Sequence, residues 1–191
     1  MKQIIFLLFL LAFSLSFAAA QTELIPAQTA LPQAPAAEVS FNFTRQSGPA
    51  SNQFAVWVED AAGQYIKTLY ATRWTAVGGW QRRPTSIPVW VSRSNLGEKT
   101  SGQLDAVSGA TGQTGRRTFT WNGTDSGGSL VPPGNYVIYV EGTLRWENQV
   151  MFRSTFTVGQ GAAPAHTSVT FSGGSTAERG MLTGVTVRAL R

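Results

Sequence analysis

Two observations predict an all-β protein, an antiparallel β-sandwich of about eight strands. Short runs of alternating apolar and polar residues recur along the chain, separated by Gly, Pro, Asn and Asp, as is typical of strands joined by turns. No window of ordinary helix length shows a convincing period of 3.6 residues. Short strands at this spacing favour a sandwich.

The first 20 residues have the features of a secretory signal peptide. Lys2 precedes an uncharged apolar run, and residues 18–21 (AAAQ) provide small residues for cleavage. The run is shorter than the roughly 20 apolar residues that a membrane-spanning helix needs, and no Cys stands at the cleavage point for lipid attachment. We therefore expect residues 1–20 to be removed on export, with no membrane span in the mature protein. Residues 21–38, rich in Ala, Pro and Gln, predict a disordered spacer.

The folded domain is expected from residue 39 to residue 191. The runs VSFNFTR, QFAVWVED and YIKTLYAT predict the first three strands, with an AAGQ turn before the third. The other five strands are predicted by RRTFTWN, YVIYVEGT, VMFRSTFTV, HTSVTFSGG and MLTGVTVRAL. The side chains expected on the two inner faces include those of Trp57, Phe119, Trp121, Tyr136 and Ile138.

The composition excludes several kinds of chemistry. Without residues 1–20 the chain has 171 residues, which suits one domain. The absence of Cys and the single His166 argue against most zinc, iron–sulfur and copper sites. No nucleophile motif accompanies His166, and the adjacent Glu59 and Asp60 point to opposite faces of a strand. We therefore expect a protein that is not an enzyme and that holds no metal. An oxygen-only calcium or magnesium site stays open, although no EF-hand spacing is present.

Positive charge is concentrated in one segment. Removal of Lys2 leaves 14 Lys and Arg against 10 Asp and Glu, a net charge of +4. Between residues 73 and 117 only Glu98 and Asp105 oppose seven basic residues: Arg73, Arg82, Arg83, Arg93, Lys99, Arg116 and Arg117. A solvated basic face and a surface for an anionic envelope partner both stay open.

Tryptophans lie in the same segment. Trp74, Trp80 and Trp90 serve either a partner or glycan surface or the core. A nucleic-acid partner is not expected of an exported protein.

The segment FTWNGTDSGGSLVPPGNYVIYVEG predicts a shaped hairpin. Its spacing of Trp, Gly, Asp, Pro and Tyr resembles a hairpin of Ig-like bacterial domains, including the one in flagellar hook-capping proteins. Asp125 is expected to bind backbone amides of the turn, the glycines to take positive φ, and Pro132 and Pro133 to stiffen the entry to the next strand.

A wider resemblance covers residues 39–191. It is carried by VWVEDAAGQYIKTL, DAVSGAT and the hairpin just described, in matching order and spacing, and more loosely by the closing ERGMLTGVTVRAL. Together they resemble a bacterial family of predicted periplasmic proteins, the domain of unknown function two-two-seven-one. The resemblance implies an Ig-like fold and a periplasmic location, and no established activity. Where that family tends to show Arg-Glu-His-Gly, this chain has RWEN at residues 145–148, so any role of that histidine is absent.

The stretch DAVSGAT is also similar to the Asp-x-x-Ser/Thr-Gly-Ala-Thr motif of FMN-binding domains in respiratory electron-transfer proteins. The resemblance implies that a periplasmic flavin transferase links FMN through its phosphate to the last threonine, and that the small neighbours leave the backbone open to the transferase. The acidic and serine side chains would shape the loop through bonds to the backbone. The implied cofactor-binding residues are Asp105, Ser108, Gly109, Ala110 and Thr111, with Arg116 and Arg117 to neutralise the phosphodiester.

Two functions therefore stay open. In the first, the protein is a flavin carrier that exchanges electrons with envelope redox proteins, and the covalent FMN performs the redox chemistry. In the second, it is a non-enzymatic binding or structural module that engages a cell-envelope partner. In the second case DAVSGAT is a structural turn, because Asp, Ser and Gly are common in turns.

Overall fold

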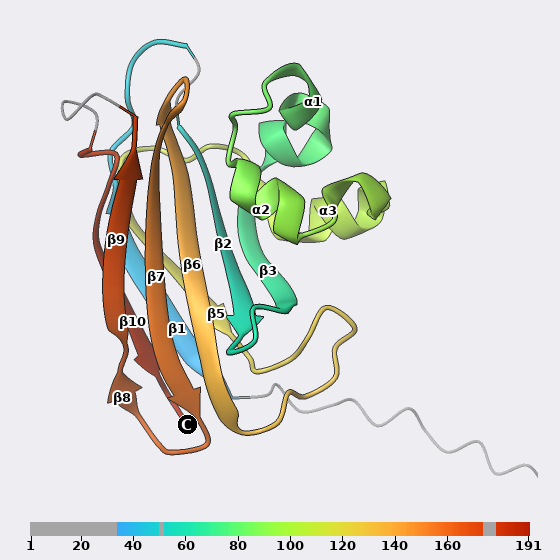
Figure 1. Cartoon of the computed structure of the whole chain (residues 1–191), viewed down its shortest axis with the longest axis vertical. Helices are drawn as coiled ribbons and strands as arrows, with labels where there is room; N and C mark the ends of the chain where they lie inside the picture. Colours follow the sequence, from blue (N-terminus) through green and yellow to red (C-terminus); the bar gives the residue numbers. More distant parts are fainter. Residues whose placement is uncertain (1–33, 50–51, 174–178) are drawn as a thin grey trace, which may run out of the picture. The chain divides into compact units, whose positions relative to one another are not determined.

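Two β-sheets face each other, and a group of short helices lies beside one of them (Figure 1). The computed structural model describes residues 34–49, 52–173 and 179–191, so the expected signal peptide and most of the spacer lie outside the described residues. In chain order the elements are β1 (Ala37–Phe43), β2 (Gln53–Asp60), β3 (Tyr65–Thr72), η1 (Thr75–Gly79), α1 (Trp80–Arg82), α2 (Pro88–Arg93), η2 (Leu96–Glu98), α3 (Ser101–Val107), β4 (Ser108–Gly109), β5 (Gly115–Trp121), β6 (Gly134–Arg145), β7 (Asn148–Val158), β8 (Ala163–Pro164), β9 (His166–Ser172) and β10 (Leu182–Ala189).

The strands form one sheet in the order β5-β1-β10-β8 and a second sheet in the order β4-β3-β2-β6-β7-β9. Neighbouring strands pair antiparallel, except that β4 runs parallel to β3. Each of the eight expected strands is present, which confirms the prediction of an all-β sandwich. Strand β1 begins at Ala37, and Ala36 is already fully buried, so the folded part starts before the expected boundary at residue 39.

The main core fills the space between the two sheets. Trp121, Tyr136 and Ile138 lie in it as expected, and Phe119 packs half-buried at its margin. The prediction for Trp57 is wrong, because this side chain is buried on the opposite face of the six-stranded sheet. Both faces of β2 are buried, so its alternation of residue types does not tell which face is the inner one.

Residues 73–107 form short helical segments that were not expected from the sequence. They bury Ile87, Trp90 and Leu96 together with Trp57, and Trp57 stacks on Tyr139 with ring centroids 5.0 Å apart. Figure 1 shows α1, α2 and α3 grouped beside β2 and β3. No helix in the described part of the chain is long and apolar enough to cross a membrane.

Polar bonds fix this helical segment to the sheet. The carboxylate of Glu141 on β6 accepts hydrogen bonds from the backbone amides of Val89 (3.1 Å) and Trp90 (2.7 Å). Burial raises the pKa of Glu141 to about 7, although both amide bonds lower it. The Trp90 indole also donates to the Thr68 hydroxyl of β3 at 2.8 Å. A buried acid and a buried indole therefore set the position of α2.

The hairpin before β6 has the predicted turn chemistry. The Asp125 carboxylate accepts from the backbone amides of Gly127 (2.8 Å) and Ser129 (2.9 Å). Gly123 and Gly128 take φ values of +78° and +89°, which side-chain-bearing residues rarely adopt.

The three tryptophans of the helical segment have different surroundings. Trp90 is fully buried and Trp80 is half-buried, whereas Trp74 is 41% exposed. The Arg83 guanidinium lies 5.0 Å from the centroid of the Trp74 ring. Trp90 is thus a core residue, and of these three tryptophans Trp74 presents the exposed ring.

Candidate functional site

The stretch DAVSGAT spans three kinds of structure. Its first three residues form the last turn of α3, Ser108 and Gly109 form β4, and Ala110 and Thr111 begin the connection to β5. Thr100 and Gln103 start α3 with a capping box, in which each side chain bonds the backbone amide of the other. The pairing of Gly109 with Thr72 brings the stretch to the same end of the sheet as Arg73.

The expected backbone bonds of two motif residues are not found. Asp105 is exposed and forms an ion pair with Arg73. The Ser108 hydroxyl is buried and has no hydrogen-bond partner in the described part of the chain. The prediction that both side chains shape a loop is therefore wrong, because Asp105 lies on a helix whose amides bond internally and Ser108 lies in a strand.

Gly109 has a packing role. A Cβ added there would lie 2.8 Å from the Tyr70 ring, far inside normal contact distance. The Tyr70 hydroxyl donates to the carbonyls of Gly109 (3.2 Å) and Ala110 (2.9 Å). Tyr70 in turn stacks on Phe54 of the main core, with centroids 5.0 Å apart. The absence of a side chain at Gly109 thus leaves room for the Tyr70 ring to pack against the backbone.

Thr111 lies half-buried in the connection between β4 and β5. The Arg117 guanidinium lies against Gly112 in the same connection and donates to the backbone carbonyl of Gln113. Arg116 points elsewhere, since its guanidinium donates to the Ser40 hydroxyl of β1 at 2.6 Å. Of the two flanking arginines, Arg117 is therefore the one that contacts the connection containing Thr111.

A cavity of about 410 Å³ opens next to the motif. Arg73 and Asp105 line it together with Trp80, Leu96 and Leu104. Its walls come from η1, α1, η2 and α3, so it exists only because the helical segment folds. This cavity was not predicted from the sequence, although Pro88 and the Thr100–Gln103 capping pattern were local signals of the helical structure that forms it.

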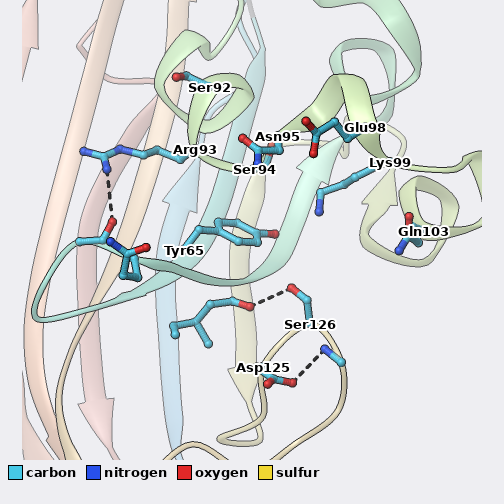
Figure 2. Close-up of a pocket in the computed structure, with 14 residues that line it drawn as sticks. Tyr65, Ser92, Arg93, Ser94, Asn95, Glu98, Lys99, Gln103, Asp125 and Ser126 are labelled. Atoms are coloured by element: carbon cyan, nitrogen blue, oxygen red, sulfur yellow. Dashed lines mark hydrogen bonds between the residues drawn. The ribbon is translucent and has the colours of Figure 1, made fainter.

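A second, larger cavity of about 740 Å³ lies beside the start of β3, and Figure 2 shows its lining. Tyr65, Arg93, Lys99 and Ser126 are among its polar residues. Arg93 donates to the Gly63 carbonyl at 3.2 Å, and its Nε lies 3.7 Å from the buried Glu59 carboxylate. The contacts of Arg93 with Gly63 and Glu59 therefore hold one wall of this cavity in place.

These observations define the class of the protein: an all-β sandwich with a helical segment on the outer face of one sheet and with cavities beside that segment. Residues 36–176 match the family described as "Predicted periplasmic protein (DUF2271)", and the chain belongs to this family. The match ends before β10, the strand that lies between β1 and β8 in the smaller sheet. No curated protein and no solved structure matches the chain.

Proposed function

We propose that this predicted periplasmic protein is a flavin carrier with FMN covalently attached at Thr111. The observation that carries the proposal is the position of the motif. Thr111 follows β4, which pairs with the end of β3 next to Arg73. Arg73 and Asp105 form an ion pair, and both line the 410 Å³ cavity. The DAVSGAT motif and this cavity therefore meet at Asp105.

The residues at this place suit a phosphate-linked flavin. A cavity of this volume falls within the range of about 300–1,000 Å³ typical of ligand pockets. The Trp80 ring and the Leu104 side chain offer apolar surface to a flat ring. Arg117 offers a positive charge against Gly112, the residue after Thr111, and such a charge would stabilise a phosphodiester there. Bound FMN supplies the redox chemistry, and this chain supplies the attachment and the surroundings.

The donor of FMN in the attachment step would be a flavin adenine dinucleotide. The Thr111 hydroxyl oxygen forms a bond to the phosphorus that carries the flavin, and the pyrophosphate bond breaks. AMP leaves, and the hydroxyl proton passes to a base of the periplasmic flavin transferase. Envelope redox proteins are the partners that the carrier would exchange electrons with.

The test is the intact mass of the mature protein co-expressed with a periplasmic flavin transferase. We expect one added FMN on the wild-type chain and none on Thr111→Ala. Thr114→Ala is the matched control, since Thr114 lies in the same connection and is exposed, with its hydroxyl accepting from the Arg45 amide. An unmodified wild-type chain, from cells in which the transferase modifies a known acceptor, would refute the proposal.

A second readout concerns the cavity. In the modified protein, Trp80→Ala is expected to raise flavin fluorescence, because a stacked indole quenches the ring. Trp146→Ala is the control, since Trp146 lies exposed in the β6–β7 turn. Equal fluorescence in both variants would place the ring outside the cavity.

A binding module for an envelope partner is the second candidate. The 740 Å³ polar cavity beside Tyr65 favours the binding module, because this cavity could hold a ligand without any modification of Thr111 (Figure 2). A colourless protein that retains a ligand in this cavity would support this function over the first.

A further inference from the structure

The lysines of this chain have an unusual distribution. The sequence has 15 Lys and Arg, of which only three are lysines, and Lys2 belongs to the expected signal peptide. The other two, Lys67 and Lys99, lie in different segments and line the same small cavity of about 290 Å³. The remaining 12 of these 15 residues are arginines. The cavity adjoins the larger one of Figure 2, with which it shares Tyr65, Lys99, Gln103 and Ser126.

The fold holds both lysines against this cavity. Lys67 lies on β3, and its ammonium donates to the Thr124 hydroxyl at 2.7 Å. Lys99 follows η2, and its ammonium lies 5.2 Å from the centroid of the Tyr65 ring. Figure 2 shows the Lys99 side chain extending between Tyr65 and Gln103. The two lysines thus line the cavity from the sheet and from the helical segment.

No carboxylate balances the two charges within the cavity. Its lining residues are Tyr65, Lys67, Thr68, Lys99, Gln103, Ala106, Val107 and Ser126. The side-chain ion pairs found among the described residues are Arg73–Asp105 and Arg93–Glu59, and neither includes a lysine. Glu98 and Asp125 line the adjoining outer cavity instead. Two half-buried lysines that form no ion pair within the described residues favour an anionic ligand, because charge removed from water needs a partner.

We propose that this cavity, the lysine pocket, binds a small organic oxyanion: a carboxylate or phosphate monoester with a short carbon chain. The volume of about 290 Å³ lies just below the range of about 300–1,000 Å³ for ligand pockets, which suits a small ligand. The hydroxyl of Ser126 and the amide of Gln103 add polar partners, and Ala106 and Val107 form an apolar wall. A lysine ammonium binds oxyanions as a compact charge without the planar geometry that Arg imposes. The proposal does not depend on flavin at Thr111.

The test is calorimetric titration of the mature protein with propionate, propyl phosphate and inorganic phosphate as probes. We expect propionate or propyl phosphate to bind with a dissociation constant on the order of 1 mM. Each of Lys67→Met and Lys99→Met should weaken that binding about tenfold or more. Arg82→Met is the matched control, because Arg82 is exposed and lies outside the lysine pocket, and it should bind as the wild type does.

A second measurement keeps the test valid if a lysine variant fails to fold. Reductive methylation of the wild-type protein with ¹³C-formaldehyde labels its two lysines, and both signals should shift together with the calorimetric affinity. The absence of saturable binding by either organic probe would overturn the proposal. So would equal binding of inorganic phosphate, unshifted lysine signals, or a loss of affinity in Arg82→Met as large as in the lysine variants.

Discussion

Replacing Glu141 by Gln is expected to remove a pH dependence from the stability of the fold. The Glu141 carboxyl is fully buried, and its two oxygens accept backbone amides of α2. Burial raises the pKa of Glu141 to about 7 in the folded protein, against an ordinary value of 4.5. The folded protein therefore holds this proton more tightly than the unfolded chain does.

The sign follows from the raised pKa. The stabilisation from the bound proton is fully present below pH 4.5 and is lost as the pH rises through 7. The difference between the two pKa values corresponds to about 3 kcal/mol in the free energy of unfolding, since one pKa unit is worth about 1.4 kcal/mol. Glu141→Gln cannot titrate, so its stability should lack this fall, although one amide of α2 loses its acceptor at every pH.

Urea unfolding followed by tryptophan fluorescence, between pH 4.5 and pH 8, measures this difference. The quantity of interest is the wild-type free energy of unfolding minus that of Glu141→Gln, because titration of other groups cancels in it. Glu98→Gln is the matched control at an exposed carboxylate and should keep the wild-type pH profile. Parallel profiles for wild type and Glu141→Gln would refute the reasoning.

Two further substitutions test the structure around the motif and the hairpin. Gly109→Ala should destabilise the protein by about 1–3 kcal/mol because the new methyl group displaces the Tyr70 ring. Its control, Gly102→Ala, meets no atom within 4 Å and should be neutral or stabilising by up to about 1 kcal/mol. Thermal unfolding compares the two variants, and equal midpoints would contradict the packing role of Gly109. Asp125→Ala should cost about 1–3 kcal/mol because two turn amides lose their acceptor, and a wild-type urea midpoint would show that the turn does not need them.

The sequence predicted the strands well because period-two alternation is a direct consequence of strand geometry. The bounds of β2 and β3 agree with the expected runs to the residue. The same alternation failed for Trp57, because the helical segment buries the outer face of β2 as deeply as the sandwich buries the inner one. A residue pattern shows that two faces differ, and it identifies the core face only where the other face meets water.

The helical segment could not be predicted from hydrophobic periodicity. Its longest helix, α3, has seven residues, whereas a helical period needs a window of about 11–18 residues to be visible. Pro88 at the start of α2 and the capping box of Thr100 and Gln103 were the local signals. The 410 Å³ and 740 Å³ cavities are both lined by this segment. The motif that ends at Thr111 could therefore be identified from the sequence, whereas the cavity next to the motif could not be predicted without the helices.

Helix α3 separates the two proposed sites, and this determines how they should be tested. Leu104 and Asp105 line the 410 Å³ cavity, whereas Ala106 and Val107 line the lysine pocket. Substitutions in α3 would disturb both cavities together, so a loss of flavin attachment and a loss of anion binding in such a variant would not be independent. Thr111→Ala and the lysine substitutions change residues outside α3, in the β4–β5 connection, in β3 and after η2. Flavin attachment and anion binding can therefore fail or succeed separately, and each result bears on one site alone.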